Sequence, residues 1–366
     1  MYNNTMQIKN LSVKNFRNYS AADTEFSPAL NILVGENAAG KTNLLEAVYL
    51  IGLGRSPRTT KEKELVKSGE DRALVKLVVE KKFRSHKIEI QIDLLGKKKV
   101  FLDGIPVLRI GELLGVLNIV YFSPDEMRLV KDAPENRRRF LDISLAQQQR
   151  VYFTALSKYN KVLKQRNNLL KTSRDSSSLD DMLSVWDMQL AENGAVIIEK
   201  RIEFIEKLQK SAEKVHTKIS EGKEKLELSY ETDTKSEENS EIAQVLLKNL
   251  KKAREKDKFL LYTTVGPHRD DMKIMINDAD VRKFASQGQQ RTTALSLKLG
   301  EMELFQEETG ESPILLLDDV LSELDENRQK LLLESTSGAQ VLLTCTEFEQ
   351  RMSAKFIRIK NGEIIK

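Results

Sequence analysis

The sequence predicts an α/β fold that is interrupted by a long helical insertion. Two apolar runs indicate the α/β part: one leads into a glycine loop and a helix near residue 40, and the other, at 313–317, ends in two acids. A third observation indicates the insertion, because apolar spacing changes from two to 3.6 residues after residue 125. We expect an α/β head formed by residues 1–124 and 259–366, and a helical arm formed by residues 125–258.

The composition fits a globular protein with a substantial core and a charged surface. Of the 366 residues, 40% are apolar and 31% are charged, and Lys plus Arg exceed Asp plus Glu by 59 − 55 = 4. The mean hydropathy is −0.43 and the sequence pI is about 8.8. This mild basic excess is compatible with nucleic acid as a partner, and an ordinary soluble surface explains it equally well.

Two features limit the cell compartment. The single cysteine, Cys345, excludes internal disulfides and cysteine-based zinc clusters. The polar N-terminus lacks the basic-then-apolar pattern of a signal peptide, and the longest apolar stretch, near 113–122, is too short to span a bilayer. We therefore expect a cytoplasmic protein.

The first part of the head is expected to combine strands, one helix and an antiparallel meander. Between residues 73 and 107, β-branched residues alternate with polar ones, with breaks near Ser85 and Gly96, which favours hairpins over β-α-β units. The expected elements are strands at 7–16 and 30–34, a helix at 41–53, the meander at 73–107 and a strand at 117–122.

The arm is expected to consist of long amphipathic helices. Apolar residues at helical spacing cover about 152–170 and 183–219, and a basic helix surrounds 248–254. Polar breaks at 172–181 and 231–240 separate them. Basic residues between the apolar positions of the first helix are assigned to its polar face: Lys158, Lys161, Lys164, Arg166 and Lys171.

The α/β pattern resumes near residue 260. A Gly-Pro turn there precedes His268, Arg269 and Asp270, which we interpret as a structural or interface loop, because no His or Cys spacing supports a metal site. The elements expected after it are a hairpin of strands at 272–276 and 281–284, a helix at 288–305, a strand at 313–317, a helix at 326–333 and strands at 340–343 and 356–365.

A phosphate-binding loop is predicted between the second strand and the first helix. Gly35 to Thr42 has the Walker A spacing G-x-x-x-x-G-K-T in the strand–loop–helix setting that the motif requires; a chance glycine turn is the alternative. Loop N–H groups and the helix N-terminus bind phosphates, Lys41 is expected to reach the β- and γ-phosphates, and Thr42 to ligate Mg²⁺. The predicted nucleotide contacts are Gly35, Glu36, Asn37, Ala38, Ala39, Gly40, Lys41, Thr42 and Asn43.

The apolar strand at 313–317 supplies a second half of the nucleotide site. It ends in Asp318 and Asp319, the form of a Walker B element. Asp318 is expected to hold Mg²⁺, and Asp319 to orient the attacking water as the catalytic acid beside Lys41. Four apolar residues and an acid pair are a weak signal alone, and the phosphate-binding loop strengthens it.

A third motif precedes the helix expected at 288–305. Ser286, Gly288 and Gln289 stand where a helix N-terminus offers a hydroxyl, free N–H groups and a positive dipole end, which together bind anions. An ordinary N-cap is the alternative. Beside the Walker motifs, this stretch has the form of the signature motif of ATP-binding-cassette ATPases, and 322–325, ending in Asp325, occupies the place of their D-loop. A signature motif completes the site of the opposite subunit in a dimer.

Taken together, the chain resembles the RecF family of bacterial DNA replication and repair proteins, which belongs with the SMC and Rad50 cassette ATPases. The resemblance covers essentially the full length, as motifs in the expected order. They are 15–19 (Asn-Phe-Arg-Asn-Tyr), 35–47, 122–125, 137–142, 266–271, 286–290, 316–319 and 322–325.

The resemblance implies an ABC-type ATPase head and an ATP-dependent homodimer. The dimer would clamp DNA near junctions of single and double strands, help RecO and RecR load RecA in gap repair, fork restart and the SOS response, and release DNA on slow hydrolysis. A weak, DNA-dependent ATPase is expected, with ATP acting mainly as a dimerisation switch. Arg17 would reach the nucleotide or the signature loop, although an ordinary surface arginine is about equally expected.

Four departures from the related families favour slow hydrolysis. Ala38 replaces a glycine of the loop, and Asp319 is one methylene shorter than the glutamate of cassette transporters. No glutamine follows the strand at 117–122 where a Q-loop would be, and Thr344 occupies the place of the switch histidine.

Several alternatives stay open. A Rad50- or SMC-like subunit working with a nuclease is disfavoured by the short arm without a Cys-x-x-Cys hook, and a transporter subunit by the missing Q-loop glutamine and switch histidine. A purely structural ATP-binding adaptor is a further option. The basic residues 137–139 are candidates for phosphate contacts with DNA, or are salt-bridge partners. The five basic residues of the first arm helix, at 158–171, are candidates too, or form a merely solvated face.

Overall fold

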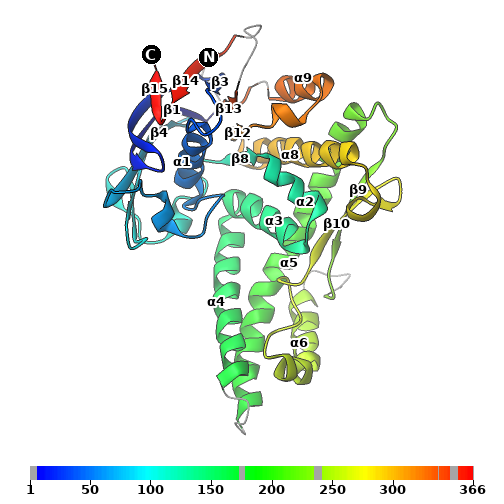
Figure 1. The fold of residues 1–366 in the computed structure, drawn as a ribbon. Coiled ribbons are helices and arrows are strands. Elements are labelled where there is room, and N and C mark those ends of the chain that lie inside the picture. Colours follow the sequence, from blue (N-terminus) through cyan, green and yellow to red (C-terminus); the bar gives the residue numbers. More distant parts are fainter. Residues whose placement is uncertain (1–5, 173–177, 235–240, 337, 347–352, 366) are drawn as a thin grey trace. The chain divides into compact units, whose positions relative to one another are not determined.

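The computed structural model describes residues 6–172, 178–234, 241–336, 338–346 and 353–365 (Figure 1). The chain divides into two compact units. The head unit comprises Met1–Met127 and Ala294–Lys366, and the arm unit Arg128–Thr293. The predicted fold class, an α/β head with an antiparallel subdomain and a helical arm, is confirmed. Domain boundaries at 124/125 and 258/259 stay a prediction.

A six-stranded sheet forms the centre of the head unit, in the order β15-β14-β3-β13-β12-β8. All neighbours are parallel except the last hairpin, β14–β15. The strands are β3 (Leu30–Val34), β8 (Ile119–Phe122), β12 (Ile314–Asp318), β13 (Val341–Cys345), β14 (Lys355–Lys360) and β15 (Glu363–Ile365). Every residue of β12 and β13 is buried, which explains why these strands are apolar runs without alternation.

A second sheet of the head unit is wholly antiparallel, in the order β2-β1-β4-β5-β6-β7, and contains the predicted meander. Its strands are β1 (Gln7–Phe16), β2 (Tyr19–Glu25), β4 (Arg72–Glu80), β5 (Ser85–Asp93), β6 (Lys98–Leu102) and β7 (Ile105–Pro106). Strand β2 was not predicted, because only Tyr19 and Ala22 in it are buried, and it is held in the sheet by its hydrogen bonds to β1.

The helices of the head unit connect these sheets. Helix α1 (Lys41–Leu53) contacts strands of both sheets, so nearly all of its residues are buried. Helix α9 (Glu326–Ser335) follows β12, and short 3₁₀ turns lie at Glu62–Leu65, Ile110–Glu112, Pro124–Met127 and Leu321–Glu323. No helix in the described ranges is long and apolar enough to cross a membrane.

The arm unit is mainly helical, as predicted. Its helices are α2 (Arg128–Lys131), α3 (Pro134–Gln148), α4 (Arg150–Thr172), α5 (Leu179–Ile219), α6 (Ile242–Leu260) and α7 (Val281–Phe284), and α8 (Gln287–Thr309) begins in it. Helix α5 packs against both α4 and α6. Residues 173–177 and 235–240 of the predicted polar breaks lie outside the described residues.

The hairpin expected at 272–276 and 281–284 is wrong in its second strand. β10 (Asp271–Ile276) pairs with the short β11 (Ala279–Asp280) and with β9 (Leu226–Glu231), which the sequence analysis missed. The segment after β11 is helix α7, because the Asp280 side chain accepts a hydrogen bond from the Arg282 N–H (2.9 Å) and caps a helical turn there.

The assignment of Arg166 to the exposed polar face of the arm is also wrong. Its side chain is wholly buried, and Nε and Nη1 donate to Asp187 (2.8 Å) and Asp257 (2.7 Å). Thr263 Oγ1 accepts a further bond from Nη1 (2.9 Å), and Arg254 Nε also donates to Asp187 (2.9 Å). Arg166 therefore lies on the packed face of α4, neutralised by carboxylates from α5 and α6.

We expect Arg166→Ala to lower the free energy of unfolding by about 3–5 kcal/mol, because it leaves two buried carboxylates without their shared cation. Urea denaturation followed by circular dichroism measures the change. Lys164→Ala, an exposed position on the same helix, is the control and should shift stability by less than about 0.5 kcal/mol. An equally small effect of Arg166→Ala would contradict the structural role of this network.

Candidate nucleotide-binding site

The predicted phosphate-binding loop connects β3 to α1, and close packing requires glycine at both Gly35 and Gly40. A Cβ atom on Gly35 would lie 2.2 Å from the carbonyl oxygen of Ile359. Gly40 has φ 119°, and a Cβ there would lie 2.8 Å from the Tyr19 hydroxyl. The loop is thus packed closely from behind, while Glu36, Asn37 and Ala38 are exposed.

Lys41 opens α1 and its ammonium group lies within the loop. Nζ donates to the carbonyl oxygens of Gly35 (2.6 Å) and Glu36 (2.9 Å), and the side chain is largely buried. The Lys41 side chain therefore folds back along the loop, and its ammonium group is bound by the loop's own carbonyl oxygens. A bound polyphosphate would offer it charged oxygens there in place of two neutral carbonyls.

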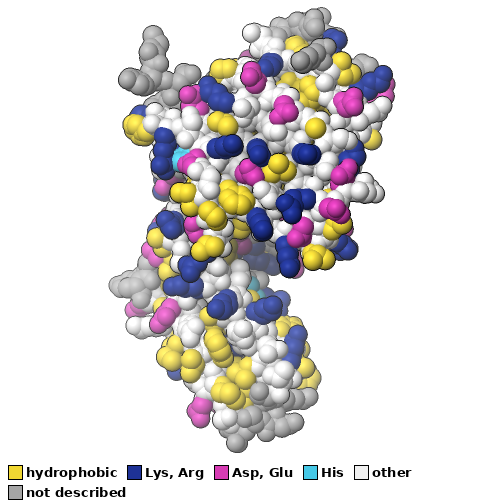
Figure 2. Space-filling view, turned by 90° about the vertical axis from the view of Figure 1, so that its left-hand side faces the viewer, with side chains coloured by type: hydrophobic (Ala, Val, Ile, Leu, Met, Phe, Trp, Pro, Cys, Tyr) yellow, Lys and Arg dark blue, Asp and Glu magenta, His cyan; other side chains and the backbone are white. Residues whose placement is uncertain are grey.

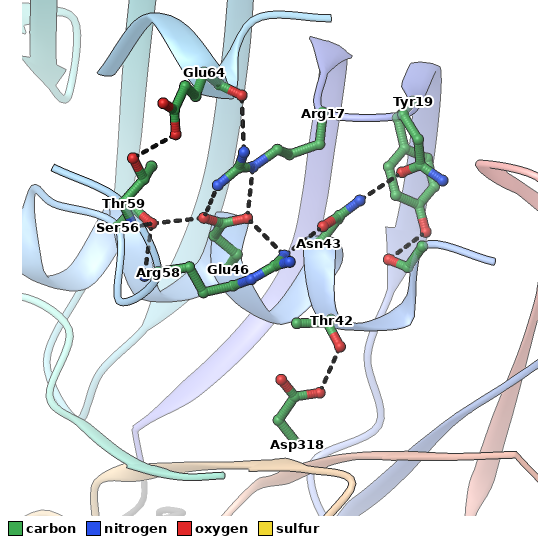
Figure 3. Close-up of polar contacts among 12 residues, drawn as sticks. Arg17, Tyr19, Thr42, Asn43, Glu46, Ser56, Arg58, Thr59, Glu64 and Asp318 are labelled. Carbon is green, nitrogen blue, oxygen red and sulfur yellow. Dashed lines mark hydrogen bonds and ion pairs between the residues drawn. The ribbon is translucent and has the colours of Figure 1, made fainter. Parts of the chain in front are cut away.

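The two Walker motifs meet at a hydroxyl–carboxylate contact (Figure 3). Thr42 Oγ1 donates to Asp318 Oδ1 at 2.8 Å. The same carboxylate accepts bonds from Thr344 Oγ1 (2.9 Å) and Tyr121 OH (3.1 Å), so its orientation is set from three sides. The register of β3, β13 and β12 explains the meeting, because parallel strands bring their carboxyl ends to one edge of the sheet.

The oxygen atoms of Thr42 and Asp318 fit Mg²⁺ bound with a nucleotide. Mg²⁺ takes oxygen ligands and is usually held by one or two protein groups, with phosphates and waters completing its octahedron. Among the described residues, no group of three or more His, Cys, Asp or Glu side chains could hold a metal by itself. The donor set therefore suits a metal that arrives with phosphate.

Asp319, the predicted catalytic acid, differs from its neighbour Asp318 in exposure and backbone. Asp318 is 6% exposed, whereas Asp319 is exposed and has φ 54°, a left-handed conformation that non-glycine residues adopt uncommonly, Asn and Asp more readily than most. The N–H of Asp319 donates to Thr344 Oγ1 (2.9 Å). Thr344 thus links both acids, a role that the sequence analysis did not foresee.

Arg17 is bound within the head unit by a buried glutamate of α1 (Figure 3). Its Nε and Nη2 donate to both carboxylate oxygens of Glu46 (2.8 and 2.7 Å), and Nη1 donates to the Glu64 carbonyl (2.9 Å). Ser56 (2.6 Å) and Arg58 (3.4 Å) also bond to Glu46. A contact from Arg17 to nucleotide stays a prediction and requires the guanidinium to exchange these partners.

The signature residues Ser286, Gly288 and Gln289 lie in the arm unit at the start of α8. The Gln289 N–H donates to Ser286 Oγ (3.2 Å), and the Ser286 N–H donates to Gln289 Oε1 (2.9 Å), which is a reciprocal capping box. The N-cap alternative is therefore observed, and it leaves the anion-binding prediction untested. Ser286 and Gly288 are exposed.

Two further titratable groups lie near the predicted motifs of the head unit. Asp325 caps α9 by accepting a bond from the Arg328 N–H (3.0 Å), and this bond lowers the pKa of the Asp325 carboxyl. Burial raises the pKa of the Cys345 thiol to about 11, so it stays protonated at neutral pH. Its side chain is buried in β13.

The loop at 268–270 and the basic cluster at 137–139 form hydrogen bonds and ion pairs within the arm unit. His268 Nδ1 bonds to the Tyr159 hydroxyl (2.7 Å), and burial lowers the pKa of His268 to about 4, so the imidazole is neutral. Arg137 is buried and bidentate on Asp271 (2.7 and 2.8 Å). These contacts favour a structural role for the loop and a role as salt-bridge partners for the basic cluster.

Comparison with known proteins places this site in a family. A family model described as "RecF/RecN/SMC N terminal domain" matches residues 7–362. The "DNA replication and repair protein RecF" of Agathobacter rectalis is 45% identical over 362 residues, covering 99% of this chain and 98% of the relative. That of Clostridium acetobutylicum is 43% identical over 364 residues, covering 98% and 99%.

Solved structures agree with this similarity. "Structure of the recombination mediator protein RecF-ATPrS in RecFOR pathway" has a TM-score of 0.93 and 40% identity, covering 100% of this chain and 99% of that chain. The structure described as RecF-ATP has the same score and identity over 99% and 98%. An Smc head domain derived from Pyrococcus furiosus, at 17% identity and a TM-score of 0.57 over 99% and 96%, shares the fold.

We expect Ala38→Gly to raise the free energy of unfolding by about 0.5–1 kcal/mol. Ala38 has φ 64°; the left-handed strain of about 1–2 kcal/mol is relieved, and the added freedom of the unfolded chain offsets about half. Ala39→Gly, at a buried neighbour without positive φ, is the control and should destabilise the protein. Urea denaturation without nucleotide measures both, and a loss of stability in Ala38→Gly would contradict the strain.

Proposed function

The chain belongs to the RecF family of DNA replication and repair proteins, within the RecF/RecN/SMC group, and we propose that it is an ATP-switched DNA clamp of recombinational gap repair. Two copies close on ATP, hold DNA near a junction of single and double strands, and release it after hydrolysis. RecR, acting with RecO, is the proposed partner, and RecA loading is the proposed outcome, in keeping with the RecFOR pathway named for the related structures.

The contact between Thr42 and Asp318 carries the nucleotide part of the proposal. It joins two motifs that are 276 positions apart in the sequence at 2.8 Å, and both groups are oxygen ligands suited to Mg²⁺. Lys41 supplies the positive charge in the same loop. These three side chains are the ones expected to bind the phosphates and the metal of ATP.

The exposed signature stretch supports a site shared between two copies. A Cβ atom on Gly288 would meet only Ser286 Oγ, at 3.9 Å, so packing within this chain gives no reason for glycine there. Ser286 Oγ accepts a bond from Gln289, which leaves its own proton free to be donated. A phosphate presented by a second copy would use both the open space and the proton.

Slow turnover is supported by the pair of acids. Asp319 would orient the water that attacks the γ-phosphate, and its carboxylate is one methylene shorter than a glutamate would be. Thr344, a neutral hydroxyl, links Asp318 and Asp319 in place of a titratable switch residue. We therefore propose that ATP acts mainly as a timer of dimerisation, with weak, DNA-dependent ATPase activity.

The lysines of α4 are the proposed phosphate contacts on the arm unit. Lys158, Lys161, Lys164 and Lys171 are exposed, and within the described part of the chain none of them forms an ion pair. On the upper part of the view in Figure 2, which is the head unit, acidic side chains are interspersed among the basic ones, so the face of the head unit shown there carries no extended patch of one charge sign. A row of unpaired lysines is therefore a more specific candidate than the surface as a whole.

We expect Lys41→Ala to abolish ATP-dependent dimerisation, because the loop loses the cation that binds the β- and γ-phosphates. Ser286→Arg should also block dimers while leaving ATP binding by the monomer intact. Sedimentation velocity with and without Mg·ATP measures assembly, and calorimetry measures binding. Dimers of Lys41→Ala with ATP would contradict the loop assignment, and loss of monomer affinity in Ser286→Arg would mean that the signature acts within its own chain.

Replacing Lys158, Lys161 and Lys164 by glutamine should weaken DNA binding and flatten its salt dependence. Each lost phosphate contact lowers the slope of log K against log[salt] by about 0.9 for duplex DNA, so the slope should fall by up to about 3. The matched control replaces Lys248, Lys251 and Lys252, which are exposed on α6. Fluorescence anisotropy on gapped DNA with ATP measures both, and an unchanged slope in the α4 variant would assign DNA binding elsewhere.

A further inference from the structure

Two carbonyl groups of the phosphate-binding loop are bonded from outside the loop. The Ala39 carbonyl accepts bonds from Asn18 Nδ2 (3.1 Å) and from the Gly362 N–H (2.8 Å). The Gly40 carbonyl accepts a bond from the Tyr19 hydroxyl (3.0 Å). Burial raises the pKa of Tyr19 above its usual range, so this hydroxyl remains a donor.

The direction of these carbonyls determines the direction of the N–H groups that follow them. A trans peptide unit is planar, so the carbonyl of one residue and the N–H of the next point to opposite sides. Holding the Ala39 carbonyl outward therefore turns the Gly40 N–H inward. Within the described residues, the N–H groups of Gly40, Lys41 and Thr42 donate to no protein acceptor. Such N–H groups at a helix N-terminus are those that bind phosphate.

The Asn18 carboxamide is itself fixed by neighbours, which determines which of its atoms faces the loop. Asn43 Nδ2 donates to Asn18 Oδ1 (2.8 Å), so the nitrogen of Asn18 is left to face the Ala39 carbonyl. Asn43 in turn accepts a bond from Arg58 Nη1 (2.9 Å). A connected row of hydrogen bonds thus leads from Arg58 through two asparagines to the loop.

The β1–β2 turn, which carries Asn18, packs closely against the phosphate-binding loop and against the β14–β15 turn. A Cβ atom on Gly40 would lie 2.9 Å from Asn18 Nδ2, and one on Gly362 would lie 2.6 Å from the Asn18 carbonyl oxygen. Asn18 therefore lies between the phosphate-binding loop and the β14–β15 turn. A shift of its side chain would be transmitted to the Ala39 peptide unit.

We propose that Asn18 is a positioning residue for phosphate binding: it holds the Ala39–Gly40 peptide so that the Gly40 N–H points at the phosphates. The proposal rests on the proposed binding of ATP in this loop and adds a residue outside the Walker motifs. Asn18 touches no reacting atom in this role. It acts through the backbone, with Asn43 holding it and Tyr19 supporting the next carbonyl.

The test compares nucleotide affinity with stability in two variants of Asn18. Asn18→Ala should weaken Mg·ATP and Mg·ADP binding by the same factor of about ten, the value of one buried hydrogen bond, because this part of the loop binds the α- and β-phosphates that both share. Asn18→Asp keeps the acceptor for Asn43 and places a carboxylate against the Ala39 carbonyl, so its loss should be at least as large. Calorimetry measures the dissociation constants, and thermal unfolding without nucleotide measures stability.

Two further variants separate positioning from a general loosening of the turn. Ser20→Ala removes a nearby hydroxyl, on strand β2, that accepts a bond from Lys67 and does not touch the loop, so nucleotide affinity should be unchanged. Tyr19→Phe should have a smaller effect than the Asn18 variants. The Gly40 carbonyl keeps two bonds without Tyr19, from the N–H groups of Asn43 and Leu44, whereas the Ala39 carbonyl keeps one without Asn18, from the Gly362 N–H.

Three outcomes would overturn the inference: unchanged affinity in both Asn18 variants, a loss confined to ATP, or an equal loss in Ser20→Ala. A lower unfolding temperature with normal affinity would show a structural role only. Failure of the unaltered protein to bind Mg·ATP would instead contradict the proposed function. If Asn18→Ala does not fold, Asn18→Asp, which is nearly the same size, decides the matter by the same criteria.

Discussion

The bond between Thr42 and Asp318 depends on the order of strands in the parallel sheet. β13 lies between β3 and β12, so the loop after β3 and the acids at the end of β12 reach the same edge with one strand separating them. Thr344, at the end of that middle strand, bonds to Asp318 and Asp319. A metal held at this edge would thus be bound by groups at the start of α1 and the end of β12, both fixed by the sheet, which limits its freedom without a dedicated protein cage.

Left-handed backbone and close packing also occur around this edge. Ala38 and Asp319 both have left-handed backbones, and Gly35 and Gly40 are in contact with neighbouring segments that would exclude any side chain. Behind them, Glu46 is a buried carboxylate whose charge is balanced by Arg17 and Arg58. These contacts hold the backbone groups of the loop in directions that the loop alone would not keep. The free energy gained when the sheets fold offsets the strain of this conformation.

Motifs with fixed spacing were predictable from the sequence, and non-local side-chain networks were not. The strand, loop and helix around residues 35–42 lie within one short segment, so motif spacing predicted them, and the apolar run before Asp318 predicted β12. The use of the loop and the acids for nucleotide stays a prediction. Arg166 was misassigned because helical periodicity does not distinguish an exposed arginine from one neutralised by Asp187 and Asp257, which are distant in sequence. The partners of Glu46 could not be predicted for the same reason, since they come from a strand end and a loop. β9 and α7 were missed because pairing and capping, rather than apolar alternation, determine them.

The bond from Gly362 to the Ala39 carbonyl has a consequence for the order in which the protein is made. The phosphate-binding loop is synthesised within the first eighth of the chain, yet β13, β14 and the turn that carries Gly362 come from its last part. Closing contacts over more than 300 residues is entropically costly and slow, so they form late in folding. A nascent chain therefore carries a complete Walker A sequence long before it can hold that sequence in the binding conformation.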